Sequence, residues 1–129
     1  MTADTSPARP VRVVIVDDHK MFRTGVKAEL SEVAPGRLEI VGEAPGVDEA
    51  IKVVRATHPD VVLLDVHLPG GNGRGGVDVL HGCVAQESLN GQPVRFLALS
   101  VSDAADDVIA VIRAGARGYV TKSITGSDL

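Results

Sequence analysis

The chain has 129 residues, of which 44% are apolar and 2% aromatic, and its formal net charge is −4. This length suffices for one domain with a core of its own, and the single cysteine, Cys83, excludes an internal disulfide and suits a reducing cytoplasm. The 13 basic residues form no run and no apolar stretch approaches membrane-spanning length, so we expect a cytoplasmic protein that neither binds DNA directly nor enters a membrane.

The predicted elements alternate between short β-branched runs and segments of helical periodicity. Residues 1–10, which include two prolines, are expected to form a flexible leader, and residues 11–129 the domain. In chain order we expect a strand at Val11–Val16, a helix at His19–Val33, a strand at Leu38–Glu43, a helix at Val47–Thr57, a strand at Val61–Leu64, a helix near Val77–Gln86, a strand at Val94–Leu99, a helix at Asp103–Arg113 and a strand at Gly118–Thr121.

The spacing of apolar residues predicts which faces of these elements are buried. Val11–Val16 is so evenly apolar that we expect this strand to be covered on both faces. Leu38, Ile40 and Gly42 are expected to share one face of the second strand, and Val108, Val111 and Ile112 to face inward from the last helix.

The segment Pro69–Gly76 contains glycine at five of its eight positions. Glycine at this density is incompatible with a helix interior, because each one costs backbone entropy on ordering. The sequence therefore predicts a mobile loop here, between the third strand and the helix that follows it.

Residues with functional groups follow four of the predicted strands: Asp17 and Asp18, Asp65, Ser100 and Lys122. The alternation of strands and helices predicts a parallel sheet with right-handed crossovers. Because the carboxyl ends of parallel strands share one edge of a sheet, we expect three carboxylates, a hydroxyl and an ammonium group to converge on one pocket.

Three carboxylates in one place repel one another, and a divalent cation relieves that repulsion. All-oxygen ligands suit Mg²⁺, with Asp18 and Asp65 as direct ligands and Asp17 as a ligand through water. Asp65 is then also a candidate nucleophile toward phosphorus, with Ser100 donating a hydrogen bond to one phosphoryl oxygen and Lys122 pairing with another. Plainer alternatives stay open, since Asp18 could be only a helix N-cap, Ser100 an ordinary loop hydroxyl and Lys122 a solvated lysine.

The letters at the strand ends form a specific set: Val16-Asp17-Asp18-His19, Leu64-Asp65-Val66-His67-Leu68-Pro69, Leu99-Ser100 and Tyr119-Val120-Thr121-Lys122. With these motifs, the chain from about Val11 to Lys122 resembles the receiver domain of bacterial two-component response regulators. Phe22-Arg23-x-Gly25 after the acidic pair, together with the segment Arg113–Tyr119, makes it most similar to the NarL/LuxR-type subfamily.

The resemblance implies a flavodoxin-like (βα)5 fold, with a doubly wound parallel five-stranded sheet of strand order 2-1-3-4-5. The fifth helix would be largely missing, because the chain ends just where Ser127-Asp128 would cap it.

The resemblance also implies that a sensor histidine kinase phosphorylates Asp65, with Mg²⁺ held by Asp17, Asp18, Asp65 and the backbone carbonyl of His67. It implies a switch in which Ser100 moves toward the phosphoryl group and Tyr119 swings inward. Without the family, Tyr119 would be read as an ordinary aromatic residue of an amphipathic strand.

A switch of this kind is not an enzyme acting on other molecules, since it catalyses only its own phosphoryl transfer and dephosphorylation. The implied partners are the histidine kinase, a second copy of the receiver in a homodimer, and DNA through an output domain for transcription regulation that this chain does not contain.

Two departures from the family pattern leave alternatives open. The glycine-rich loop is longer than usual and is either an inert surface insertion or a segment that alters dynamics near Asp65, and Val101 stands where a small residue is common. One alternative is therefore a degenerate receiver that acts as a phosphorylation-independent dimerisation module. Another is a phosphatase or phosphotransferase with Asp65 as nucleophile, although such enzymes usually carry a second acid where His67 stands.

The remaining candidate groups give weak signals. His19, His58 and His81 lie on different predicted elements, which argues against a zinc site. Cys83 is expected to be a core residue of its helix and not a nucleophile.

Overall fold

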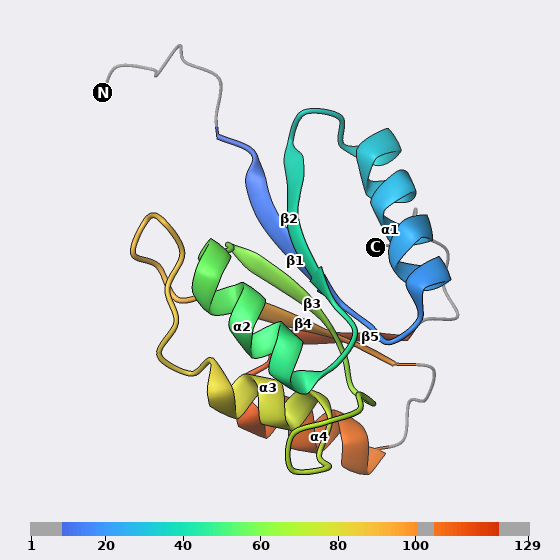
Figure 1. Cartoon of the computed structure of the whole chain (residues 1–129), viewed down its shortest axis with the longest axis vertical. Helices are drawn as coiled ribbons and strands as arrows, with labels where there is room; N and C mark the ends of the chain where they lie inside the picture. Colours follow the sequence, from blue (N-terminus) through green and yellow to red (C-terminus); the bar gives the residue numbers. More distant parts are fainter. Residues whose placement is uncertain (1–8, 101–104, 122–129) are drawn as a thin grey trace.

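The computed structural model describes residues 9–100 and 105–121, which form a five-stranded parallel sheet with helices on both faces (Figure 1). In chain order the elements are β1 (Val11–Val16), α1 (Lys20–Val33), β2 (Leu38–Ala44), α2 (Val47–Thr57), β3 (Val61–Asp65), α3 (Gly76–Gly82), β4 (Arg95–Ser100), α4 (Ala105–Ala114) and β5 (Gly118–Thr121). The strand order is β2-β1-β3-β4-β5, and every pairing is parallel. The predicted flavodoxin-like α/β fold is thus confirmed, while Ser127-Asp128, the predicted cap of a fifth helix, lies outside the described residues.

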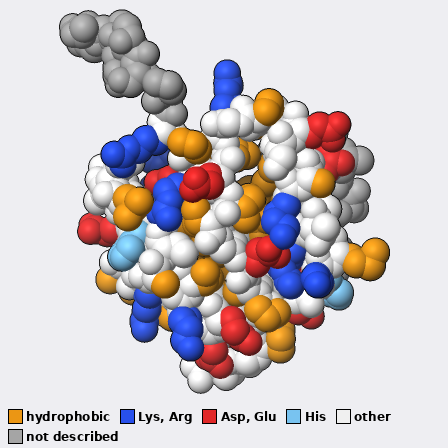
Figure 2. Space-filling view, turned by 45° about the horizontal axis from the view of Figure 1, so that its top comes forward, with side chains coloured by type: hydrophobic (Ala, Val, Ile, Leu, Met, Phe, Trp, Pro, Cys, Tyr) orange, Lys and Arg blue, Asp and Glu red, His pale blue; other side chains and the backbone are white. Residues whose placement is uncertain are grey.

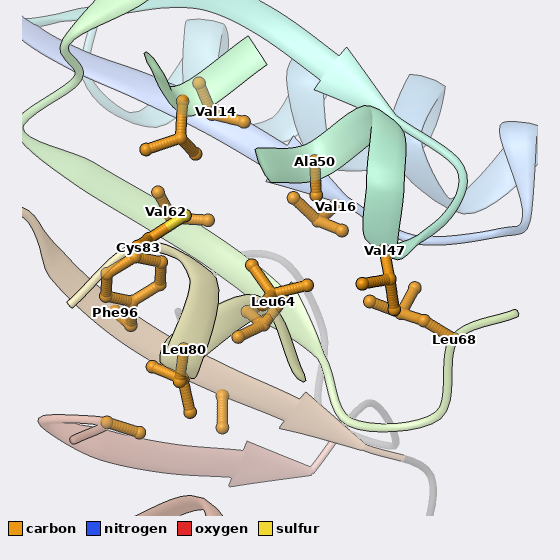
Figure 3. Packing of buried hydrophobic residues seen from close by; sticks show 14 of the residues in the cluster. Val14, Val16, Val47, Ala50, Val62, Leu64, Leu68, Leu80, Cys83 and Phe96 are labelled. Carbon is orange, nitrogen blue, oxygen red and sulfur yellow. The ribbon is translucent and has the colours of Figure 1, made fainter. Parts of the chain in front are cut away.

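The larger part of the core lies between the sheet and the helices α2, α3 and α4 (Figure 1). Aliphatic side chains from the central strands point toward those of α2 and α3 in the close view of Figure 3, and Phe96 is the one aromatic ring among the labelled residues. The labelled members are Val14, Val16, Val47, Ala50, Val62, Leu64, Leu68, Leu80, Cys83 and Phe96. An interior of this kind follows from a composition with few aromatic residues.

The opposite face of the sheet packs against α1. Val13 and Ile15 of β1, Leu63 of β3 and Leu99 of β4 are buried there with Val26 of α1. Alternate residues of β1 therefore belong to two different cores, which confirms the prediction of a strand covered on both faces.

A β-bulge in β2 changes the predicted face of Gly42. Val13 pairs with Ile40 but Val14 pairs with Gly42, so Val41 is an extra residue in the ladder. Leu38 and Ile40 consequently pack on the α1 side, whereas a Cβ on Gly42 would lie 2.5 Å from Val53 Cγ2 of α2. The prediction that Gly42 shares a face with Leu38 and Ile40 is wrong, because one inserted residue reverses the alternation.

Two helix predictions also need correction. Helix α3 ends at Gly82 and not near Gln86, because the chain turns at Cys83 and continues into an antiparallel bridge between Glu87 and Pro93. In α4, Val111 is fully buried as predicted but Ile112 is 45% exposed, since only a narrow stripe of this helix faces the core.

None of the helices in residues 9–100 and 105–121 combines the length and the apolar character that a membrane span requires.

Candidate functional site

Three aspartates meet at the carboxyl edge of the sheet, where β1 and β3 lie side by side. Val16 pairs with Leu64, so that Asp17 and Asp65 occupy the next positions of adjacent strands. Ligand atoms of Asp17, Asp18, His19 and Asp65 all lie within 4.8 Å of one another. The strand order that places β1 beside β3 therefore brings together carboxylates that are far apart in the sequence.

The turn after β1 is held by the first aspartate. Asp17 is fully buried, and its Oδ1 accepts a hydrogen bond of 2.8 Å from the His19 backbone N–H. His19, not Asp18, is the N-cap of α1, and it makes no side-chain capping bond. The alternative that Asp18 serves only as a helix N-cap is wrong, because the Asp18 carboxylate lies in the acidic cluster instead.

His19 is a member of this cluster that the sequence reasoning missed. Its Nδ1 lies 3.2 Å from Asp17 Oδ1 and 3.0 Å from Asp18 Oδ1, while the side chain is 71% exposed. The signal was present in the Asp-Asp-His triplet, since a residue directly after an acidic pair at a strand end can turn back toward both carboxylates.

The second acidic position lies at the end of β3. Asp65 is only 4% exposed, and its Oδ1 accepts a hydrogen bond of 3.3 Å from the His67 backbone N–H. Val66 continues the β3 ladder by donating its N–H to the Leu99 carbonyl at 2.9 Å. The backbone of residues 65–67 is thus fixed beside the carboxylate.

Ser100 and Thr121 pair across β4 and β5, and Asp65 pairs with Leu99. Ser100 is fully buried and directly follows Leu99, the residue that pairs with Asp65. Lys122, like Val101, lies outside the described residues, so the predicted role of its ammonium group stays a prediction.

Tyr119 is half-buried on β5 and packs against the core on the α2–α4 side. Its hydroxyl is buried and has no hydrogen-bond partner among the described residues. Among the described residues, the burial of this hydroxyl is therefore not offset by a hydrogen bond.

The glycine-rich segment between β3 and α3 has a defined hydrogen-bonded path. Asp78 of α3 is 7% exposed, and its Oδ2 accepts the backbone N–H groups of Asn72 at 3.0 Å and Arg74 at 2.8 Å. Gly76 donates its N–H to the Val66 carbonyl at 2.7 Å. A buried carboxylate thus organises this loop from its inner side, which its composition did not reveal.

A surface pocket of about 610 Å³ continues from the acidic cluster along this loop. Its wall includes Asp18, His67 and Arg74, together with Val77 of α3 and Val111 of α4. This pocket leaves the Asp18 end of the cluster open at the surface of the described residues.

The donor set at the edge fits Mg²⁺ on chemical grounds. Three carboxylates offer hard oxygen ligands in a small volume, two of them on nearly inaccessible aspartates, and a divalent cation offsets their mutual repulsion. No cysteine belongs to the set: Cys83 is buried in the core, where desolvation raises its pKa to about 11 and keeps the thiol protonated.

Comparison with known proteins gives consistent findings. The sequence profile of the response regulator receiver domain matches residues 13–129. The nitrate/nitrite response regulator protein NarL of Escherichia coli is 38% identical over 124 residues, 96% of this chain and 53% of that protein. The DNA-binding transcriptional activator DevR/DosR of Mycobacterium tuberculosis is 40% identical over 120 residues, 92% of this chain and 51% of that protein.

Solved structures give the same result. The signal receiver domain of NarL from Mycobacterium tuberculosis superposes with a TM-score of 0.80 at 34% identity, covering 93% of this chain and 90% of that one. A response regulator of the LuxR family from Aurantimonas superposes with a TM-score of 0.75 at 32% identity, covering 92% and 79%. The chain spans about half the length of the curated relatives that it matches.

Proposed function

This chain belongs to the response regulator receiver domain family, and from that premise we propose that it is a phosphorylation switch whose acceptor is Asp65 and whose donor is a sensor histidine kinase. The observation that carries the proposal is the position of Asp65, which is 4% exposed at the end of β3 and lies within 4.8 Å of ligand atoms of Asp17 and Asp18. Burial beside two further carboxylates is the setting in which a cation-assisted phosphoryl acceptor is expected.

The reaction requires the Asp65 carboxylate to approach a phosphorus atom that is itself surrounded by negative charge. A Mg²⁺ ion held by Asp17, Asp18, Asp65 and the His67 carbonyl would supply the positive charge that makes this approach favourable. One oxygen of Asp65 forms a bond to phosphorus while the phosphorus–nitrogen bond of the donor phosphohistidine breaks, and the departing imidazole takes up a proton. The products are an acyl phosphate on Asp65 and a free histidine on the kinase.

Further residues of the same edge complete the proposed switch. Ser100 would donate a hydrogen bond from its hydroxyl to one phosphoryl oxygen, and Lys122 would pair with another. Tyr119, whose hydroxyl is buried without a partner among the described residues, would follow the movement of Ser100. Hydrolysis of the acyl phosphate returns the switch to its resting state, so the chain acts on no substrate other than its own phosphoryl group.

The output of the switch would lie in a DNA-binding domain outside this chain. The curated relatives are about twice as long and include a protein named as a DNA-binding transcriptional activator. On the face drawn in Figure 2, Lys and Arg side chains are interspersed with Asp and Glu and form no broad basic patch. Since a kinase of this kind makes its phosphohistidine from ATP, the proposal also implies that the protein lies in the cytoplasm. A homodimer formed through the receiver is a further proposed state.

The proposal is tested by incubating the chain with Mg²⁺ and acetyl phosphate and measuring intact mass. We expect a gain of one phosphoryl group in the wild type and none in Asp65→Asn or in wild type with excess EDTA. Asp48→Asn is the matched control, because Asp48 is an exposed aspartate at the start of α2. No gain in any variant would leave the dimerisation module as the better interpretation, and rapid turnover of unrelated phosphate esters would indicate an enzyme.

A further inference from the structure

We propose that Arg23 is a positioning residue for the divalent-cation site, holding the Asp17–Asp18 peptide in place from α1 while Glu43 of β2 fixes its guanidinium. The inference rests on the proposed function, since it assigns a role relative to the cation that Asp17 and Asp18 would bind. Arg23 itself touches neither the cation nor the phosphoryl group in this scheme.

The contacts of Arg23 join three elements next to the acidic cluster. Its Nη1 donates to the Asp17 backbone carbonyl at 2.6 Å, and its Nε donates to Glu43 Oε1 at 2.9 Å. The side chain is only 13% exposed, and its bond to the Asp17 carbonyl is partly buried, whereas its bond to Glu43 lies at the surface. One planar guanidinium therefore links the loop after β1 to the end of β2.

The Asp17 carbonyl, which Arg23 binds, helps to set the position of the next residue, Asp18. The Asp17 carbonyl and the Asp18 N–H belong to one rigid peptide plane, so fixing the first sets the direction in which Asp18 leaves the strand. On its other side Asp17 is also fixed, because its N–H donates to the Ala44 carbonyl at 3.0 Å. The backbone that carries both acidic side chains is thus held before any cation arrives.

Glu43 fixes the orientation of the Arg23 guanidinium. Its second oxygen, Oε2, accepts a hydrogen bond of 2.6 Å from Lys27 Nζ, one turn further along α1. The bonds from Lys27 and Arg23 lower the pKa of Glu43, which keeps this carboxylate ionised. An ionised Glu43 also compensates the guanidinium charge, so that Arg23 can support the site without opposing a bound cation.

A purely structural role for Arg23 makes a different prediction. If it only ties α1 to β2, then Lys27 should matter in the same way, because Lys27 binds the same carboxylate from the same helix. Among the described residues, Lys27 binds Glu43 but not the Asp17 carbonyl, so Lys27→Gln is the matched control. Arg23→Lys tests geometry alone, since a single ammonium group keeps the charge but lacks the two divergent N–H groups.

The experiment is a titration of the folded chain with Mn²⁺, in which the free ion is measured by electron paramagnetic resonance and Mg²⁺ is used as a competitor. Circular dichroism confirms folding of each variant at the temperature used. We expect Arg23→Gln and Arg23→Lys to weaken ion binding about 10- to 100-fold, the range seen when the support of a metal ligand is removed. Lys27→Gln should stay within about twofold, as an exposed ion pair contributes little.

Phosphorylation by acetyl phosphate separates positioning from catalysis. Each Arg23 variant should reach the wild-type extent of modification when Mg²⁺ is raised enough to fill its weakened site. The inference is overturned if Arg23→Lys binds Mn²⁺ as the wild type does, or if Lys27→Gln loses as much affinity as the Arg23 variants. A wild-type chain that binds no Mn²⁺ would instead overturn the proposed function, so the two failures are distinguishable.

Discussion

The two loops that flank the acidic cluster both hold the backbone beside an aspartate, but they differ in length and in how they are fixed. Residues 17–19 connect β1 to α1 in a tight turn, whereas residues 66–75 connect β3 to α3 along a wide, glycine-rich path (Figure 1). Each must hold the backbone next to an aspartate so that the carboxylates converge. A tight turn leaves few conformations to exclude, while a long one must lose many.

The two loops are fixed by side chains of opposite charge, which come from different positions relative to the loop. The tight turn is held by a cation, Arg23, that binds its carbonyl from the adjacent helix. The long loop is held by an anion, Asp78, that accepts two of its N–H groups from within. The lesson is that a loop around a functional site can be ordered by its neighbours or by its own anchor, and each strategy has its own weak point.

The largest predicted effect comes from the backbone of the long loop. Gly75 has φ +60°, and a Cβ there would lie 2.1 Å from the Val66 carbonyl oxygen. We expect Gly75→Ala to lower the free energy of unfolding by more than about 3 kcal/mol, because the backbone strain and the clash add. Urea unfolding measures the loss.

The control for this prediction is Gly73→Ala. Gly73 also has a positive φ, but a Cβ there meets nothing within 4 Å, so about 1 kcal/mol is expected from strain alone. Equal losses in the two variants would show that the close approach of Gly75 to the strand end has no energetic weight.

Removal of the anchor of the long loop comes next. Asp78→Ala should cost about 2 kcal/mol, because two backbone N–H groups lose a charged acceptor in a nearly buried position. Asp48→Ala, which removes an exposed carboxylate at the start of the neighbouring helix α2, should change stability little. Urea unfolding of the pair checks the prediction, and comparable losses would contradict an anchoring role.

On the side of the tight turn we expect a mutation that stabilises. Asp18→Asn removes one of three carboxylates that lie within 4.8 Å, so the metal-free chain should gain about 1 kcal/mol as repulsion falls. Thermal unfolding in EDTA should show a higher midpoint than wild type, and addition of Mg²⁺ should raise the midpoint of wild type only. Glu29→Gln, an exposed change on α1, controls for net charge. A lower midpoint in EDTA would contradict the repulsion that we infer.

The smallest effect concerns pH. Since its folded-state pKa lies below the ordinary value of 4.5, Glu43 stabilises the fold fully above about pH 4.5 and loses this contribution as the pH falls through the lower folded value. The difference in unfolding free energy between wild type and Glu43→Gln should therefore be under about 1 kcal/mol at pH 7 and shrink below pH 4.5. Urea titrations at several pH values test this, and a difference that grows on acidification would contradict the sign.

The sequence predicted the sheet well because its signal is local. β-branched runs alternate with helical spacing, and this pattern alone gives parallel strands whose ends meet. For that reason the sequence alone predicted that Asp17, Asp18 and Asp65 lie close together. Which of them accepts a phosphoryl group is a separate question, and the role of Asp65 stays a prediction.

The features that could not be predicted depend on distant partners. Five glycines identify a loop, but nothing in their spacing shows that Asp78 binds its N–H groups. Arg23 was visible in a motif, yet its role depends on Glu43, which comes from strand β2 and is placed beside Arg23 only by the fold. The bulge at Val41 could not be predicted from the sequence either, because an inserted residue leaves the hydrophobic composition of a strand unchanged.

That bulge has a consequence for the behaviour of the protein in solution. Among the described strands, β2 lies at one edge of the sheet and pairs with β1 alone. An outer strand offers unpaired donors and acceptors to other molecules, and a regular one invites aggregation. The extra residue at Val41 disturbs the spacing of those groups, and the exposed carboxylate of Glu39 adds charge beside it. Self-association by strand addition is thereby discouraged along β2.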